Sequence, residues 1–529
     1  MKKFLSTILT CLLLVSVVST GVSAESIEEL EVSSIVQGYL QAQADAKYLA
    51  KDENLTQNTL AAFSEDKVQK IQQMVDKAQM TRSASLANEI KVDSDFAEYM
   101  AEKAHFIQYT RKAEKLHISN YSVTYGTPDV EISGNIAKVE IFETVCMQYD
   151  GLDEMSAVST EYVLNLVKAE NDWVIVDITS DDMFDKAHSQ EDFDYETAVE
   201  EYDAAMAVPG KIEVERDVTD QVDQLAASGA NQTPYDRTSA ANYSLTYTTS
   251  TNVNTRNYYN KNFYNFASLG GDCMNYASQC MYAGFGGSDD KTAIDSYAYP
   301  MDQSGSSWYT NSSGNKSPSW AGTVSFLNYA NAANGTAPSQ DNILFNVYYT
   351  NASDLKDIYN WQNRLLGSIL LVNDDGHAMV ISKVTGSSTS QIFVSAHTND
   401  VKLVPLSQCL SAGDRSNGYH VIIPDSYYSY TNTPNCRVAS KWQDAVAQNT
   451  TLNLSATAIR KSGGTVYRMA ARVVTPSGAE KWLGEEYNTT SYNRSYQFAE
   501  KGLYQVTTYA RELSSSANSV SSTISVRVY

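Results

Sequence analysis

The residues with the clearest potential for chemistry surround Cys273, in the run Gly270-Gly-Asp-Cys-Met-Asn-Tyr-Ala-Ser-Gln-Cys280. Two glycines interrupt the chain, Asp272 is a residue type that caps helices, and an amphipathic stretch continues as far as Gly284. The pattern therefore predicts a helix that starts with Cys273. At that position the unsatisfied N–H groups and the positive end of the helix dipole favour a thiolate, which is the nucleophilic form of cysteine.

A thiolate nucleophile needs a base, and His377 is the best candidate. It follows an apolar strand at 369–372 and a short polar loop, and it opens a second strand that runs to residue 384. A third strand at 391–396 ends just before His397. If the last two strands pair as a hairpin centred near Ser387, His397 faces His377 and Asn399 is its diagonal neighbour. Either side chain would then orient the imidazole, with His397 the first choice.

Other polar and aromatic residues accompany this arrangement. Asp272, Asn275 and Gln279 lie in the cysteine segment and are candidates for substrate binding. Trp308 and Trp320, with eleven tyrosines between residues 235 and 309, suggest an aromatic cleft that stacks on sugar or peptide, although core packing explains many of these rings.

Several other chemistries are not indicated. The sequence has no Cys-x-x-Cys and no His-Glu-x-x-His, and its six histidines are isolated from one another, so neither a metal site nor a cofactor is expected. The net charge of 39 − 62 = −23 argues against nucleic acid as a partner, because phosphate is bound through Lys and Arg. Five cysteines lie beyond residue 24, and all except Cys273 are expected to be buried hydrophobes.

The elements that carry these residues occupy the middle of the chain. Residues 1–24 have a basic start, an apolar stretch and a small-residue cleavage site, which predict a signal peptide and a secreted protein without a transmembrane anchor. Residues 25–205 change from helical periodicity to alternating strands near Ile118, which predicts an acidic α+β accessory domain. Residues 206–233 are a predicted linker.

The second half of the chain differs in charge and composition. Residues 1–223 carry 18 basic and 42 acidic side chains, whereas residues 224–529 carry 21 and 20. The predicted catalytic domain spans 234–425, and a Tyr- and Ser-rich linker at 426–447 leads to strands at 448–529 that predict a small, Ig-like β-sandwich with a net charge of 9 − 5 = +4.

The central region resembles a known family. Tyr235-Asp-Arg237, Asn260, the Asp-Cys-Met-Asn-Tyr-Ala-Ser-Gln run at 272–279, Ser307-Trp-Tyr309, Ser319-Trp320 and Gly376-His377 are similar to the bacterial putative amidase domain family over about 234–425. The resemblance implies an α+β fold with a papain-like cysteine hydrolase core, a helix packed on an antiparallel sheet. It also implies that Cys273 is the nucleophile and His377 the base. Gly367-Ser368 and Tyr276 depart from the family pattern, which often has Gly-Asp and Phe there.

These observations predict an exported cysteine amidase or peptidase whose expected substrate is a peptidoglycan peptide, a choice that rests on export and family alone. The C-terminal domain is expected to contact wall polymers, and the protein to be associated with the cell wall. Two alternatives remain open. In the first alternative, the protein is an inactive extracellular binding or adhesion protein. In the second, it is a transglutaminase-like acyl transferase that uses the same triad.

Overall fold

A computed structural model gives the fold of the 529-residue chain. It describes residues 24–49, 65–80, 92–93, 96–182, 184–185, 193–216, 231–249, 258–269, 271–298, 300–301, 308–332, 342–398, 400–429, 436–440, 445–460, 467–489, 491–512 and 520–528. The predicted signal peptide therefore lies almost entirely outside the described residues, as does Asn399. Within the described part, no helix is long and apolar enough to cross a membrane.

Packing divides the chain into two compact units, one of which comprises residues up to Gln108 with Tyr125–Glu143 and Glu161–Ser180. In the N-terminal region the helices α2, α3 and α4 precede the strands β1 to β5, and the change falls at residue 118, as the periodicity predicts. The helices span Ala24–Leu49, Glu65–Met80 and Phe96–Ala113, and the strands span Ile118–Tyr125, Asp129–Ser133, Ile136–Tyr149, Ser156–Ala169 and Asp172–Ser180. β2 pairs with β3, and β4 with β5, both antiparallel.

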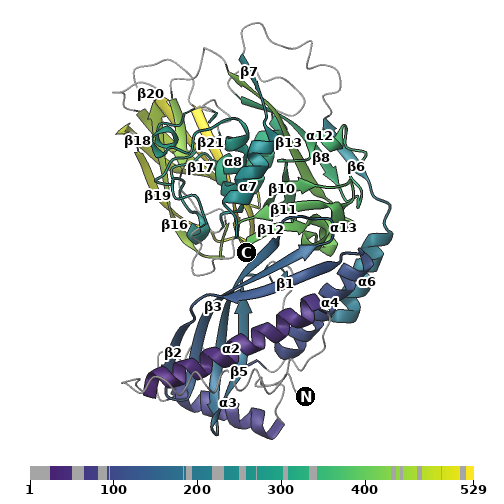
Figure 1. The fold of residues 1–529 in the computed structure, drawn as a ribbon. Coiled ribbons are helices and arrows are strands. Elements are labelled where there is room, and N and C mark those ends of the chain that lie inside the picture. The colour runs from purple at the N-terminus through teal and green to yellow at the C-terminus, as the bar shows by residue number, and fades with distance from the viewer. Residues whose placement is uncertain are drawn as a thin grey trace. The chain divides into compact units, whose positions relative to one another are not determined.

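The second unit contains a large antiparallel sheet with the strand order β12-β11-β10-β9-β13-β8-β6, and β7 pairs with the end of β13 (Figure 1). Helices and antiparallel strands thus share one domain, which confirms the α+β class. The strands span Asp400–Pro405 (β12), Ile392–Ala396 (β11), His377–Val384 (β10), Ile369–Val372 (β9), Tyr419–Ser429 (β13), Asn342–Thr350 (β8), Ile212–Arg216 (β6) and Asn231–Pro234 (β7). The helix α6 (Tyr195–Ala207) precedes β6.

Two hydrophobic cores lie on opposite faces of this sheet, because alternate residues of a strand point in opposite directions. Ala378 and Val380 of β10 belong to one core, and Met379 and Ile381 to the other. The first core is covered by α7 (Arg237–Thr246), α8 (Cys273–Gly284), α10 (Pro318–Ala321) and α11 (Thr323–Ala332), and Figure 1 shows α7 and α8 over the sheet.

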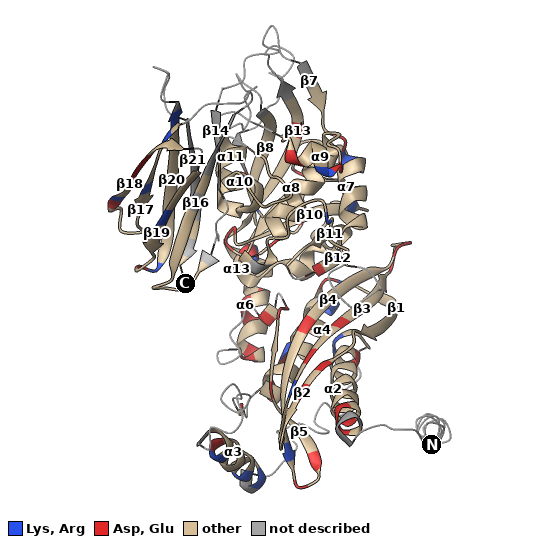
Figure 2. Cartoon of the chain, turned by 90° about the vertical axis from the view of Figure 1, so that its left-hand side faces the viewer, with Lys and Arg blue, Asp and Glu red and all other residues tan. Residues whose placement is uncertain are grey.

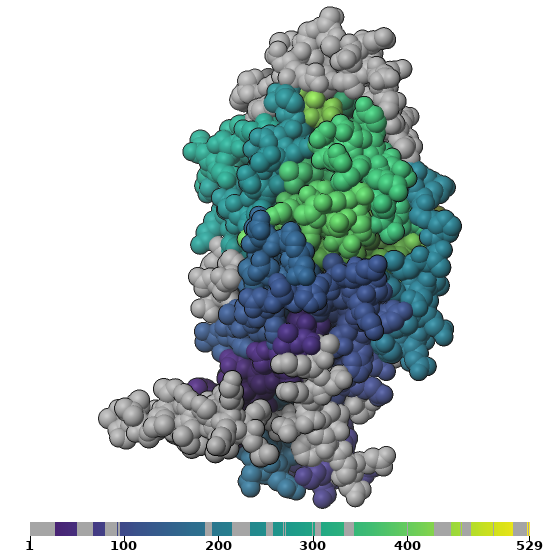
Figure 3. Space-filling view, turned by 45° about the vertical axis from the view of Figure 1, so that its right-hand side comes forward, coloured from purple at the N-terminus to yellow at the C-terminus, as the bar shows by residue number. Residues whose placement is uncertain are grey.

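The remaining short elements complete the unit. The loop after β8 covers the second core with Leu355, Ile358 and Leu365. Short helical segments are η3 (Ala267–Leu269), α9 (Lys291–Asp295), α12 (Trp361–Arg364), η4 (Thr389–Gln391), η5 (Leu406–Cys409) and α13 (Ala412–Ser416). In the space-filling view, described residues between 237 and 332 (teal) and between 342 and 429 (green) lie side by side on the face shown (Figure 3).

The C-terminal strands form two sheets with a common core. The first sheet has the order β14-β16-β19 and the second β15-β21-β20-β17-β18, and Leu454 and Tyr492 of the first pack with Met469, Val506 and Val526 of the second. The strands span Cys436–Ser440 (β14), Ala445–Val446 (β15), Thr451–Arg460 (β16), Tyr467–Val474 (β17), Glu480–Thr489 (β18), Ser491–Gln497 (β19), Gly502–Glu512 (β20) and Val520–Val528 (β21).

The charge asymmetry of the sequence is visible on the elements. Acidic side chains lie along α2, α4 and α6, whereas the helices and strands of the central region carry few charged residues (Figure 2). The acidic excess therefore belongs to the N-terminal elements and not to the segment that contains Cys273.

Candidate active site

Cys273 is the first residue of α8, as the sequence predicts. Gly271, two residues before it, has φ +136°, a left-handed conformation that glycine adopts without strain, and the chain approaches the helix through it. Cys273 is 9% exposed and packs in the same core as Leu371 and Ala378. The thiol is thus held at the positive end of a buried helix that lies against β9 and β10.

Asp272 occupies the N-cap position, but its carboxylate does not cap the helix. Only 1% of Asp272 is exposed, and its Oδ1 accepts hydrogen bonds from the Phe266 N–H at 2.7 Å and from Asn275 Nδ2 at 2.8 Å. Its Oδ2 lies 2.9 Å from Nδ1 of His397. The expectation that the Asp272 side chain caps α8 is therefore wrong, because its carboxylate contacts Phe266, Asn275 and His397 instead.

His397 does not occupy the position that the hairpin register predicted. β10 and β11 pair Val380 with Ser395, one residue away from the expected alignment, with a bulge between Ile381 and Lys383. The connection contains η4, a turn of 3-10 helix that a simple hairpin lacks, and this extra turn changes the register. His397 is therefore not opposite His377.

The contacts of His397 also argue against its predicted role of orienting His377. Its Nδ1 lies against the Asp272 carboxylate and its Nε2 against the carbonyl oxygen of Tyr247. Both atoms that face the ring are acceptors, so both nitrogens donate only if the ring is an imidazolium. The ring is stacked between Tyr259 at 3.7 Å and Tyr276 at 4.0 Å. His397 thus anchors the start of α8 and has no ring nitrogen left to orient His377.

His377 is the first residue of β10 and pairs with Val372 of β9. It is 6% exposed. The loop before it contains Asn373, Asp374 and Asp375 in succession with φ of +54°, +54° and +59°, and the N–H of Asn373 donates to Oδ1 of Asp414 at 2.7 Å. This tight loop fixes where the strand begins.

The sheet end where His377 lies is also the end where α8 begins. His397 follows the last residue of β11, and its ion pair with Asp272 ties the first turn of α8 to that end of the strands. Cys273 and His377 therefore start two elements that contact each other at the same end of the sheet.

The remaining predicted site residues are structural. Asn275 donates to the Tyr264 carbonyl at 3.0 Å and accepts from Nε1 of Trp320 at 2.7 Å. Gln279 accepts from the Tyr243 hydroxyl at 2.8 Å. Trp308 and Trp320 are fully buried and 4.5 Å apart between ring centroids. The predicted stacking of these tryptophans on a substrate is therefore wrong, because the core encloses both rings.

Comparison with known protein families gives a match in this region of the chain. Residues 234–422 match the family model described as "Putative amidase domain". This match confirms the resemblance that the sequence predicts for this region. No curated protein matches the chain.

Several solved structures also match, and one of them shows how faint the likeness is. It is the extracellular domain of the putative one component system BT4673 from B. thetaiotaomicron, with 12% identity and a TM-score of 0.14. The match covers 36% of this chain and about a third of the other, 31%. So weak a likeness carries no argument about fold or function.

Three further thiols of the second unit are buried in its core. Cys280 in α8 and Cys409 in η5 are buried thiols outside any disulfide, as is Cys146 of β3. Burial raises the pKa of Cys280 well above its ordinary value and that of Cys409 to about 12. The expectation that these three cysteines are core residues is confirmed.

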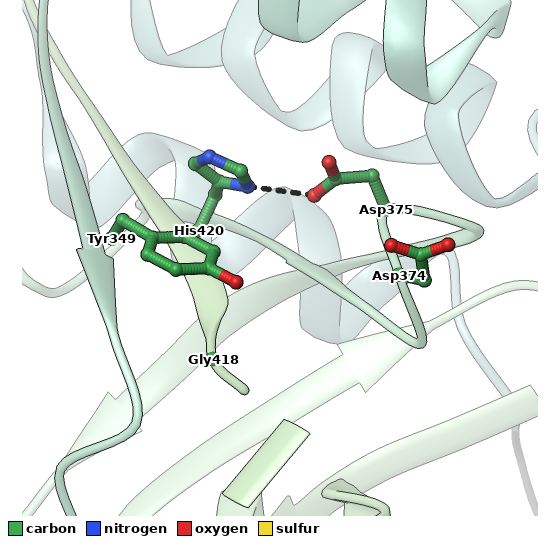
Figure 4. A pocket seen from close by; sticks show the side chains of 5 residues that line it. All are labelled: Tyr349, Asp374, Asp375, Gly418 and His420. Atoms are coloured by element: carbon green, nitrogen blue, oxygen red, sulfur yellow. Dashed lines mark hydrogen bonds and ion pairs between the residues drawn. The ribbon is translucent and has the colours of Figure 1, made fainter. Parts of the chain in front are cut away.

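The amidase domain also contains a pocket that sequence reasoning missed. Tyr349, Asp374, Asp375, Gly418 and His420 line it (Figure 4). These residues come from three separate segments, and only the pairing of β13 with both β8 and β9 brings them together. The one signal in the sequence is the pair of aspartates just before His377. Among the described residues, no group of three or more His, Cys, Asp or Glu side chains is arranged to hold a metal ion.

Proposed function

We propose that the amidase domain is a papain-like cysteine hydrolase in which Cys273 is the nucleophile and His377 the general base. The observation that carries this is the placement of Cys273 at the start of α8, a helix packed on the strand that His377 opens. Family membership supports the cleavage of amides, and the thiol at a helix N-terminus supports the cysteine mechanism.

The proposed reaction proceeds in two steps. His377 takes the proton of Cys273, and the thiolate attacks the amide carbonyl to form a tetrahedral intermediate. The N–H of Cys273 at the helix start donates to the developing oxyanion. The C–N bond then breaks as His377 gives its proton to the leaving amine, which leaves a thioester. Water, deprotonated by His377, hydrolyses the thioester to a carboxylate and restores the thiol.

The geometry of β10 sets a requirement for His377. Ala378 and Val380 point towards the core that contains Cys273, so strict alternation would direct His377 to the other face. As the first residue of the strand, His377 must reach the thiol around the end of the sheet. Both ring nitrogens of His397 already contact other groups, the Asp272 carboxylate and the Tyr247 carbonyl oxygen. Asn399 is therefore the remaining candidate for the residue that orients the imidazole of His377.

A direct test uses the purified full-length chain with muropeptides and follows the release of new amino groups. Cys273→Ala should abolish release, and His377→Ala should lower kcat about 10²-fold or more. Cys280→Ala is a matched control, because it removes a thiol from the same helix, two turns further along. Equal activity in the wild type and in Cys273→Ala would overturn the mechanism.

The alternatives give different results in the same experiment. A protein that binds muropeptides without releasing amine, in every variant, is the binding or adhesion protein. Incorporation of an added amine into the product in preference to water identifies a transglutaminase-like acyl transferase. The proposed substrate is a peptidoglycan peptide, and the proposed location is extracellular, in contact with the cell wall.

We further propose that the C-terminal sandwich contacts wall polymers through aromatic side chains. Its positive charge is partly neutralised, because Arg468, Arg472 and Arg494 each pair with a glutamate of β18. Trp482 and Tyr487 on the same strand are 57% and 55% exposed. Sedimentation with purified walls tests this proposal: Trp482→Ala should reduce the bound fraction, whereas loss of binding with salt alone would favour a purely electrostatic contact.

A further inference from the structure

The pocket lined by Tyr349, Asp374, Asp375, Gly418 and His420 lies next to the proposed active site. It has a volume of about 240 Å³, and its walls come from β8, from β13 and from the loop that joins β9 to β10. Asp374 and Asp375 in that loop are three and two residues before His377. The same short loop therefore forms a wall of the pocket and sets the position of the proposed base.

The pocket opens on the sheet face that carries Cys273. Val347 of β8 and Ile422 of β13 belong to the core that contains Cys273, and Tyr349 and His420 lie two residues from them along the same strands. Alternation therefore directs Tyr349 and His420 to that face.

The strand register gives the distance from the neighbour of the proposed base. Tyr349 pairs with His420, His420 with Leu371, and Leu371 with Ala378, so the four residues form a row across the sheet. Two strand spacings separate His420 from Ala378, about 10 Å, and Ala378 directly follows His377 in β10. About two or three residues of extended peptide therefore span the distance from the start of β10 to the pocket.

The lining of the pocket favours a cation. Two carboxylates, one phenol and one imidazole line it, and neither Lys nor Arg is among the five lining residues. The Asp375 carboxylate is held in place by Nδ1 of His420 at 2.7 Å, and His420 is only 8% exposed. Figure 4 shows the two side chains pointing toward each other, with the Asp374 carboxylate beside them.

The aromatic wall adds to this preference. The ring of Tyr349 lies 4.8 Å from the ring of His420 and presents a face on which an alkylammonium can stack. The pKa of Tyr349 is raised, first by burial and then by the charges of Asp375, Asp374 and Asp414, in keeping with the acidic lining of the pocket. A metal ion fits less well, since the described residues contain no cluster of three ligating side chains.

We propose that this pocket is a subsite for a primary ammonium group of the substrate. Asp374 and Asp375 bind the ammonium, His420 holds the Asp375 carboxylate in place, and Tyr349 packs against the attached carbon chain. The substrate class is then a peptide amide with a free amino group about two or three residues from the scissile bond. That group is either the α-amine of the chain end or the side-chain amine of a diamino acid. The inference rests on the proposed function, because it places the subsite relative to Cys273.

The test measures binding without turnover. Full-length Cys273→Ala protein is titrated in a calorimeter with a Lys-containing tetrapeptide amide, with its Nα-acetyl form and with its Nε-acetyl form. The affinity should fall about tenfold when the amine that enters the pocket is acetylated, and the arm that loses affinity identifies the source of the ammonium. Equal affinity for all three peptides overturns the proposal.

A matched pair of variants separates the pocket from general charge. Asp374→Asn in the Cys273→Ala background should abolish the preference for the free amine. Asp357→Asn removes the same charge from an exposed loop position between Leu355 and Ile358, which pack in the opposite core, and should preserve the preference. Equal losses in the two variants would refute a specific subsite.

Hydrolysis assays distinguish the failure of this inference from the failure of the proposed function. If the wild type cleaves free and acetylated peptides with the same KM, the subsite is wrong and the cysteine hydrolase stands. If the Cys273→Ala protein selects the free amine but the wild type cleaves nothing, the subsite stands and the proposed hydrolase is wrong. If both hold, Asp374→Asn should raise KM for the free amine with little change in kcat.

Discussion

The ion pair between Asp272 and His397 should be the main stabilising contact at the start of α8. The Asp272 carboxylate is almost fully buried and makes three hydrogen bonds, to the Phe266 N–H, to Asn275 and to His397. Asp272→Asn keeps the size of the side chain but removes its charge. The His397 ring then lies buried between two tyrosine rings without the carboxylate that its Nδ1 contacts.

The expected cost follows from this geometry. Breaking a buried ion pair by removing one partner destabilises proteins by about 3–5 kcal/mol, far more than the loss of an exposed pair. Because the carboxylate and the helix start are held together, the effect should appear as local opening of α8. Hydrogen exchange of peptides covering 272–284 should therefore accelerate about 10²-fold or more in Asp272→Asn.

A second aspartate provides the control. Asp290 is the N-cap of α9, where its exposed carboxylate accepts from the Thr292 N–H at 2.6 Å. Asp290→Asn makes the same chemical change, and since asparagine caps helices about as well as aspartate, exchange should stay close to that of the wild type. If Asp272→Asn exchanges no faster in α8 than Asp290→Asn does, the ion pair is not what holds the helix start.

Three further predictions concern thiol reactivity and packing in the amidase domain. Iodoacetamide at pH 7.5 should alkylate Cys273 well before Cys280 and Cys409, because burial raises the pKa of those two thiols; mass spectrometry that finds Cys280 modified first would contradict this. Trp320→Ala should destabilise the domain by about 3–5 kcal/mol in denaturant unfolding, as expected for a fully buried ring, while a Trp320→Phe variant that still folds should leave KM unchanged. Gly367→Ala should lower the melting temperature, since Gly367 has φ +73° and an added Cβ would lie 3.0 Å from the Arg237 carbonyl oxygen; an unchanged melting temperature would refute the strain argument.

Local patterns of the sequence were sufficient to predict the elements that carry the candidate site. Glycines, a capping residue type and helical periodicity indicated a helix from Cys273 to Gly284, and alternation indicated the strands on either side of His377. The change from helix to sheet at residue 118 was equally clear. These features depend on backbone propensity and on which face of an element is apolar, and both are properties of neighbouring residues.

Pairing across the sheet was not predictable in this way. The 3-10 turn in η4 and one bulge shifted the β10–β11 register by a single residue, and a shift of one residue exchanges the faces of a strand. His397 consequently joined Asp272 in the core instead of facing His377. The burial of Trp308 and Trp320 was undetermined for a similar reason, since an aromatic residue near an active-site motif has the same sequence signature in a cleft and in a core.

The sequence by itself therefore determined where the candidate nucleophile and the candidate base stand along the chain, and that the acidic charge belongs to the N-terminal elements. Only the tertiary structure decided which polar residues share a face. The pocket of Asp375, His420 and Tyr349 exists because β13 pairs with β8 on one side and β9 on the other, which joins segments up to 71 residues apart. Such contacts depend on strand order and register, which are set by the burial of both sheet faces together rather than by any local pattern.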